Sequence, residues 1–195
     1  MNTLKEYIKE NVVITNKEAE KFGYTRYNLS ELTKSGQLER LRPGLYQLKG
    51  KVIDDFVLIS SNSNRIIFSH QTALYLHDLS DRTPSVFHIS VPQGYNASHI
   101  KKRYEDLQVH YVKKDLYEIG KTEIKSPQGN LIPIYDIERT ICDIIIDREK
   151  IDKQIFTDAI KRYFKSNNKN LRLLIKYSRL FKIEDEIRKY MEVLS

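Results

Sequence analysis

A short run of side chains between Thr25 and Lys34 carries groups that can bind nucleic acid. Arginine can pair with guanine and asparagine with adenine, while tyrosine, threonine and lysine reach phosphates or thymine methyl groups. The expected contact residues of this run are Thr25, Arg26, Tyr27, Asn28, Ser30 and Lys34, with Tyr24 on the same exposed face. Taken alone, the run is equally compatible with an ordinary solvated helix face.

The elements around this run decide between the two interpretations. Thr15 and Glu18 have the spacing of a capping box, which predicts a helix from Asn16 to about Phe22, after an earlier helix near residues 3–10. Thr25 is the expected N-cap of the next helix, which should end at Ser35-Gly36. Two helices joined by about three residues predict a helix-turn-helix.

A basic hairpin is expected directly behind the second of these helices. The run LERLRPGLYQL has two short apolar segments around Arg42-Pro43-Gly44, where proline presets the first turn position and glycine supplies a positive φ at the second. Arg40 and Arg42 would meet the sugar-phosphate backbone or the adjacent minor groove. The order of three helices followed by a hairpin predicts a winged helix-turn-helix over residues 1–50. The combination of the capped helices, the polar and aromatic helix face and the basic hairpin favours DNA binding.

The rest of the chain mixes helix and strand patterns. The fold class is therefore α+β, with a mixed α/β domain at 52–195 that ends in helices. Helices are expected at VIDDFVLIS, at HQTALYLHDLS with Ser69 as N-cap, and in four amphipathic segments after Asp136; strands are expected at VFHISVP, LQVHYVK, Tyr117–Ile124 and Leu131–Ile134.

Composition narrows the class of protein. The 195 residues include 33 Lys and Arg against 26 Asp and Glu, a net charge of +7 that lies at the two ends of the chain and suits a polyanionic partner. One cysteine, Cys142, excludes a disulfide framework. Without a signal peptide or a membrane-length apolar stretch, a cytoplasmic protein with no membrane association is expected.

A second basic patch lies near the C-terminus and is a possible accessory nucleic-acid contact, although a solvated helix face is the simpler interpretation. It comprises Lys161, Arg162, Lys165, Lys169, Arg172 and Lys176.

The sequence contains only a weak indication of catalytic residues. Glu123-Ile124-Lys125 matches the E-x-K element of some metal-dependent nucleases, with Asp106 or Asp115 as a further metal-binding carboxylate. Three-residue matches are common by chance, so no catalytic residue, cofactor or enzyme activity is predicted. The cluster of Asp136, Glu138, Arg139 and Asp143 is interpreted as structural, with Asp136 capping a helix.

The histidines give no recognised metal motif. His70, His77, His88, His99 and His110 form no H-E-x-x-H pair. His70 and His77 could share a helix face, but half-buried or capping roles are favoured, and no metal site is predicted.

Three segments in order resemble the AbiEi antitoxins of type IV toxin–antitoxin systems, which act in abortive phage infection. They are GYTRYNLSELTKSGQLERLRPGLYQL, FSHQTALYLHDLS with VFHISVPQGY, and IYDIERTICDII. The resemblance spans about residues 4–150. It implies an N-terminal winged helix that binds inverted repeats in its own promoter and a C-terminal antitoxin domain at 52–195. The toxin would be nucleotidyltransferase-like, countered without a stable complex.

The resemblance places the DNA contacts on Thr25, Arg26, Tyr27, Asn28, Arg40 and Arg42. Because inverted repeats present two half-sites, two copies per operator are expected. The alternative is a stand-alone winged-helix repressor whose C-terminal domain senses a ligand.

Overall fold

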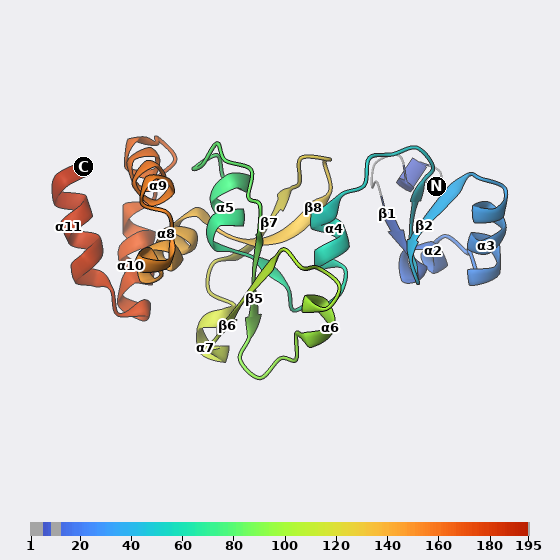
Figure 1. Cartoon of the computed structure of the whole chain (residues 1–195), viewed down its shortest axis with the longest axis horizontal. Helices are drawn as coiled ribbons and strands as arrows, with labels where there is room; N and C mark the ends of the chain where they lie inside the picture. The colour runs from blue at the N-terminus through green and yellow to red at the C-terminus, as the bar shows by residue number, and fades with distance from the viewer. Residues whose placement is uncertain (1–5, 9–12, 195) are drawn as a thin grey trace. The chain divides into compact units, whose positions relative to one another are not determined.

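The computed structural model describes residues 6–8 and 13–194 (Figure 1). The chain divides into two compact units. Unit 1 holds Met1–Ser61 with Lys125–Leu131, and unit 2 holds Asn62–Ile124 with Ile132–Ser195. This division differs from the expected boundary at residues 50–52, since the segment up to Ser61 and a distant turn both group with the N-terminal elements.

Unit 1 begins with a winged helix-turn-helix, as the sequence predicts. Its elements are β1 (Val13–Thr15), α2 (Asn16–Lys21), α3 (Arg26–Lys34), β2 (Leu38–Arg42) and β3 (Leu45–Leu48), and the antiparallel sheet has the order β1-β3-β2. Of the helix expected near residues 3–10, residues 6–8 are helical and the remainder lies outside the described residues. Sequence analysis missed β1, which is only three residues long.

Local chemistry explains where these elements start and turn. The Glu18 carboxylate accepts the Thr15 amide at 2.7 Å, and the Glu18 amide donates to the Thr15 hydroxyl, which completes the expected capping box of α2. Gly44, in the turn between β2 and β3, has φ +79°. The core beneath α2 and α3 consists of Ile8, Ile14, Ala19, Leu29, Leu38 and Tyr46.

A buried carboxylate joins the last helix of unit 1 to the distant turn. Helix α4 (Asp55–Ser60) has Asp54 as its N-cap, and Asp54 Oδ1 accepts the Phe56 and Val57 amides. The other oxygen, Oδ2, accepts the Ser126 hydroxyl at 2.5 Å and the Asn130 amide group at 2.6 Å. These bonds explain why 125–131 belongs with the N-terminal segment.

Unit 2 is built on a five-stranded mixed sheet with the order β6-β5-β4-β8-β7. Its strands are β4 (Ile67–Phe68), β5 (Phe87–Pro92), β6 (Leu107–Val112), β7 (Lys121–Lys125) and β8 (Leu131–Tyr135). Short helices accompany them: α5 (His70–Leu76), α6 (Ser98–Lys101) and α7 (Lys114–Tyr117). Neighbours β5 and β6 are parallel, with His88 opposite Gln108 and Ser90 opposite His110.

Four helices and one 3-10 turn complete unit 2. They are α8 (Ile137–Ile146), η1 (Arg148–Lys150), α9 (Lys153–Lys165), α10 (Leu171–Phe181) and α11 (Glu184–Leu194), which agrees with the four amphipathic segments predicted. Helix α8 contacts both α5 and α10, and its Ile141, Ile144 and Ile145 lie in the largest apolar cluster of the unit. The mixed helices and strands confirm the α+β class.

Arg139 is the most unusual buried residue of unit 2, at 1% exposed. Its guanidinium donates to the Asp143 carboxylate at 2.9 Å and to the backbone carbonyls of Leu116 and Ile119 at 2.7 and 2.8 Å. Its carbon atoms approach Gly120 so closely that a Cβ at this glycine would lie 2.6 Å from Arg139 Cβ. Asp136 caps α8 as predicted, so this charged cluster holds the fold together.

Candidate nucleic-acid interface

The N-terminus of α3 is fixed by a second capping box, and this constrains two expected contact residues. Asn28 Oδ1 accepts the Thr25 amide at 2.9 Å and the Thr25 hydroxyl at 2.7 Å, while the Asn28 amide donates back to Thr25 Oγ1. Bidentate pairing of Asn28 with adenine needs that same oxygen as an acceptor. Thr25 and Asn28 therefore have a structural role at this helix end, in addition to any contact they make.

Other residues on the expected contact face of α3 point to solvent. Tyr27 is 71% exposed, and Arg26 and Ser30 are also exposed. Tyr24 corrects the sequence-based expectation: it is half-buried and packs against the apolar core of unit 1, because it precedes α3 and lies toward α2. The exposed part of the face thus begins at the helix cap.

The remaining expected contacts differ in accessibility. Lys34 is exposed and pairs with Glu31 at 2.9 Å on the same helix. Arg40 on β2 is exposed, whereas Arg42 is only partly exposed because the strand register shifts between Arg40 and Arg42. Arg40 is therefore the wing arginine that is best placed to meet a ligand.

Helix α3 and the wing, which is the hairpin of β2 and β3, border one concave surface. The hollow that it encloses has a volume of about 540 Å³. Its lining residues are Asn16, Arg26, Ser30, Thr33, Lys34, Arg40, Pro43, Gly44 and Tyr46. The structure thus brings four of the expected residues, Arg26, Ser30, Lys34 and Arg40, to a single hollow. Sequence analysis did not include Asn16, whose Oδ1 is buried with no hydrogen-bond partner among the described residues.

Residues 2–49 match the family model described as "Transcriptional regulator, AbiEi antitoxin". The N-terminal segment is therefore similar to the AbiEi antitoxin regulators. This confirms the predicted resemblance over these residues, and it supports a role as an antitoxin or transcriptional regulator. No curated protein sequence matches the chain.

The fold of the chain is similar to a solved structure, the crystal structure of the RV2827C protein from Mycobacterium tuberculosis. The two share 14% sequence identity and a TM-score of 0.55, over 90% of this chain and 69% of that one. The likeness therefore extends beyond the AbiEi-type segment to the fold of most of the chain. No helix in the described ranges is long and apolar enough to cross a membrane.

The basic residues expected as an accessory patch lie on α9, α10 and the turn between them. Four of them are exposed: Lys161, Lys165, Arg172 and Lys176. The other two already have partners, since Arg162 forms a two-pronged ion pair with Asp81 and Lys169 donates to the Ser166 carbonyl. The free positive charge of this patch is thus smaller than the sequence indicates.

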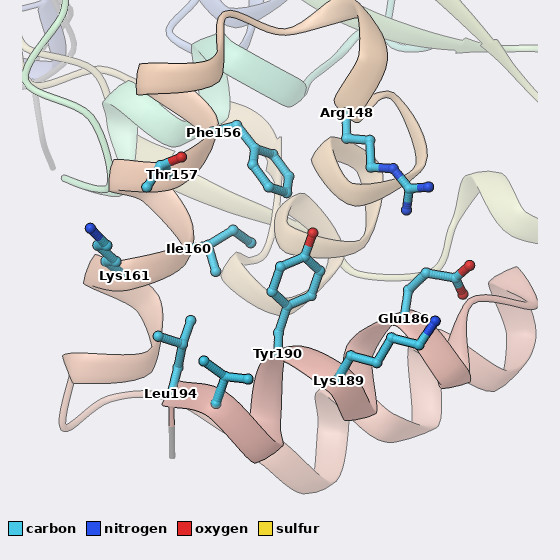
Figure 2. A pocket seen from close by; sticks show the side chains of 10 residues that line it. Arg148, Phe156, Thr157, Ile160, Lys161, Glu186, Lys189, Tyr190 and Leu194 are labelled. Carbon is cyan, nitrogen blue, oxygen red and sulfur yellow. The ribbon is translucent and has the colours of Figure 1, made fainter.

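A groove of about 450 Å³ lies between α9 and α11, where Figure 2 shows its lining side chains. Phe156, Ile160, Tyr190 and Leu194 form an apolar surface there, with Lys161 at the α9 side. Charged side chains also belong to its lining, namely Arg148, Lys161, Glu186 and Lys189, so the groove is mainly apolar with charged residues among its walls.

The residues of the nuclease alternative are not brought together. Glu123 and Lys125 are exposed on β7, an edge strand, and Asp106 immediately precedes β6 at the opposite edge of the sheet. Among the residues that the structure describes, the one group of three or more converging metal-ligand side chains does not include Glu123.

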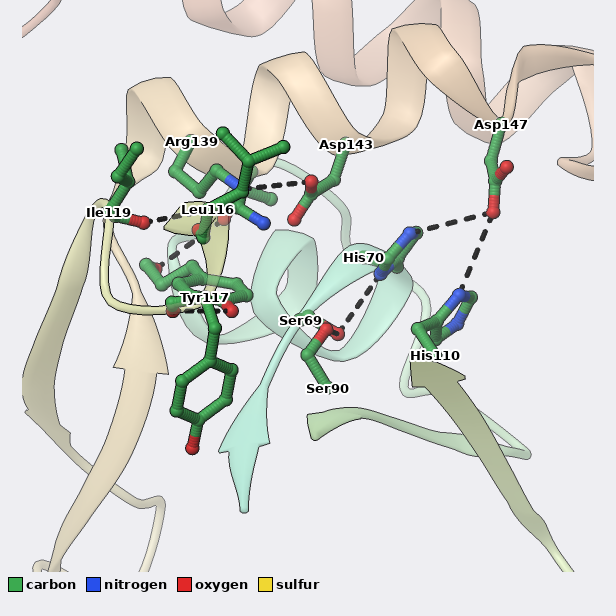
Figure 3. A network of polar contacts seen from close by, with 12 residues as sticks. Ser69, His70, Ser90, His110, Leu116, Tyr117, Ile119, Arg139, Asp143 and Asp147 are labelled. Atoms are coloured by element: carbon green, nitrogen blue, oxygen red, sulfur yellow. Dashed lines mark hydrogen bonds and ion pairs between the residues drawn. The ribbon is translucent and has the colours of Figure 1, made fainter. Parts of the chain in front are cut away.

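That group consists of His70, His110 and Asp147 (Figure 3). His88 lies next to it, with its Nδ1 3.0 Å from His110 Nε2. Burial, with a smaller contribution from the neighbouring His70, lowers the pKa of His88 to about 4 and that of His110 to about 3. The hydrogen bond with His70 holds the pKa of Asp147 well below its usual range. His77 is half-buried, ends α5 and contacts the Tyr135 carbonyl at 2.7 Å, which agrees with the half-buried or capping role favoured for it.

Sequence analysis missed this cluster for a physical reason. His88 and His110 come from strands whose parallel register cannot be read from either strand alone, and Asp147 follows a helix in a different part of the chain. The only local signal is that both histidines lie inside short alternating strand patterns.

Proposed function

We propose that this chain is an autoregulating antitoxin whose winged helix binds inverted repeats in its own promoter, with two copies per operator. The observation that carries the proposal is the concave surface shared by α3 and the wing, within a segment that matches AbiEi antitoxin regulators. Arg26 enters the major groove, Ser30 and Lys34 contact phosphates, and Arg40 meets the backbone or minor groove beside it.

The proposed division of labour assigns DNA binding to the winged helix within residues 1–50 and antitoxin action to residues 52–195. The partner is a nucleotidyltransferase-like toxin that is countered without a stable complex. The protein would act in the cytoplasm, where both the promoter and the toxin are accessible.

Binding to the promoter of its own operon tests the first part. We expect Arg26→Ala to weaken specific binding about 10- to 100-fold in a gel shift, because a base-reading arginine contributes about 1–3 kcal/mol. Arg40→Ala should weaken binding to all sequences and reduce the salt slope by about one, because it removes one phosphate contact.

Lys17→Ala is a suitable control, since Lys17 is exposed on α2 and does not line the concave surface. Equal affinity of the wild-type chain for the promoter and for scrambled DNA would contradict specific recognition. Asn28→Ala is a poor probe of base contact, because it also removes the capping box of α3.

Toxin rescue tests the second part. In cells that express the proposed nucleotidyltransferase-like toxin, the full chain carrying Arg26→Ala and Arg40→Ala should lose repression but retain rescue. Loss of both would place the two activities on the same residues. Intact repression with no rescue by any form of the chain would favour the stand-alone repressor.

A further inference from the structure

Four side chains from separate elements of unit 2 form one cluster of contacts, which lies outside the candidate nucleic-acid interface. His70 begins α5, His88 and His110 lie on the parallel strands β5 and β6, and Asp147 caps the end of α8. His70 and His110 both face the same carboxylate oxygen of Asp147 (Figure 3).

The distances suit a metal ion between these three groups. Asp147 Oδ2 lies 3.5 Å from His70 Nε2 and 3.6 Å from His110 Nδ1. Ligands on a tetrahedral zinc with bonds of about 2.1 Å are separated by about 3.4 Å, so little movement is needed to admit an ion. The two imidazole rings are stacked with an interplanar angle of 11°, and a turn of one ring about its broad χ2 torsion would make the two nitrogens converge.

The second nitrogen of each histidine already has a polar partner. His70 Nδ1 contacts the buried Ser69 hydroxyl at 3.0 Å, which in turn accepts the Ser90 hydroxyl at 2.9 Å. His110 Nε2 contacts His88 Nδ1 at 3.0 Å. Outer contacts of this kind fix the tautomer and orientation of histidine ligands in metal sites.

The backbone at His70 gives an independent indication. His70 has φ +49°, a left-handed conformation that is uncommon for residues other than glycine. Strained conformations of this sort occur preferentially at functional sites, where the surrounding structure maintains them. His70 is also buried, with 7% of its surface exposed, and its ring lies against Asp147.

We propose that His70, His110 and Asp147 bind a divalent transition-metal ion of the zinc type, with His88 orienting His110. Imidazole nitrogens favour zinc, copper, iron or nickel, whereas magnesium and calcium prefer oxygen ligands. Lys150 binds the other oxygen of Asp147 at 2.8 Å, which leaves Oδ2 for the metal. A fourth ligand would enter from the adjoining cavity of about 410 Å³, which the three ligands help to line.

Metal titration of the untagged full chain tests this site. After treatment with a chelator, we expect one Zn²⁺ per chain by calorimetry, and Co²⁺ should give the absorption bands of a tetrahedral site. His110→Ala and Asp147→Asn should weaken Zn²⁺ binding at least 100-fold. His88→Ala should weaken it about 10- to 100-fold, because it removes only an outer contact.

His99→Ala is the matched control, since His99 is exposed and lies outside the cluster. The Zn²⁺ affinity of this variant should equal that of the wild type. Wild-type thermal unfolding gives a second measurement that needs no variant: Zn²⁺ should raise the midpoint, and Mg²⁺ should not. Absence of one-to-one Zn²⁺ binding, or equal affinity in Asp147→Asn, would overturn the proposal and leave the cluster as a set of direct contacts between the histidines and Asp147.

Discussion

Replacing Arg139 by methionine is expected to lower the free energy of unfolding by about 3–5 kcal/mol, the range found when one partner of a buried ion pair is removed. The substitution leaves the Asp143 carboxylate buried without its cation, and Asp143 Oδ2 already has no partner among the described residues. It also removes the donor to the Leu116 and Ile119 carbonyls. Urea unfolding followed by circular dichroism measures the loss.

The aromatic contacts of Arg139 add to this effect. Its guanidinium carbon lies 4.1 Å from the ring centre of Tyr135 and 4.3 Å from that of Phe181, so the cation is held between two aromatic faces. Methionine retains part of the packing volume but none of the charge. The expected loss therefore comes mainly from the unpaired polar groups.

Two further variants make this test specific. Arg172→Met, on the exposed side of α10, makes the same chemical change and should alter stability by less than about 0.5 kcal/mol. Arg139→Met combined with Asp143→Leu should recover much of the loss, because it removes both charges together. If Arg139→Met alone costs less than about 1 kcal/mol, the guanidinium does not have the structural role assigned to it.

Replacing Asp54 by alanine is expected to cost about 3–4 kcal/mol. The cap of α4 accounts for about 1 kcal/mol, and each charge-assisted hydrogen bond to Ser126 and Asn130 for about 1.5 kcal/mol or more. Because Ser126 and Asn130 are themselves buried, their polar groups would have no substitute acceptor in water. Hydrogen exchange should show α4 and residues 125–131 losing protection together.

Asp55→Ala is the matched control, since Asp55 is the adjacent acidic residue, is exposed, and lies in the first turn of α4. It should cost no more than about 0.5 kcal/mol. Equal losses for Asp54→Ala and Asp55→Ala, or loss of protection in α4 without a change at 125–131, would contradict the assigned role of Asp54.

The parts of the fold that sequence predicted are those with local causes. The capping box at Thr15, the N-cap at Thr25, the Pro43-Gly44 turn and the apolar periodicity of α8 to α11 each depend on residues within a few positions. Very short strands such as β1 and β4 lack enough residues to show alternation, and they form because neighbouring strands supply partners.

The candidate nucleic-acid interface was predictable in position but not in detail. Residue types and spacing predicted Arg26 and Arg40 as contacts, and both are exposed and line one hollow, whereas the engagement of Asn28 in the cap depends on a rotamer that the sequence does not specify. Tyr24 illustrates the same limit, because a tyrosine suits either a core edge or an exposed face. The histidine cluster could not be predicted from the sequence for a stronger reason: its prediction needs the register of two strands as well as the directions of the side chains.

The partners of Asp54 also bear on how the chain folds during synthesis. The two residues that bind its Oδ2 lie 72 and 76 positions later in the sequence. A ribosome that adds about 5–20 residues per second needs several seconds to reach them, whereas the winged helix can close its own core earlier. The winged helix can therefore complete its own core before the Asp54 contacts that hold α4 are formed, and before unit 2 has been fully translated.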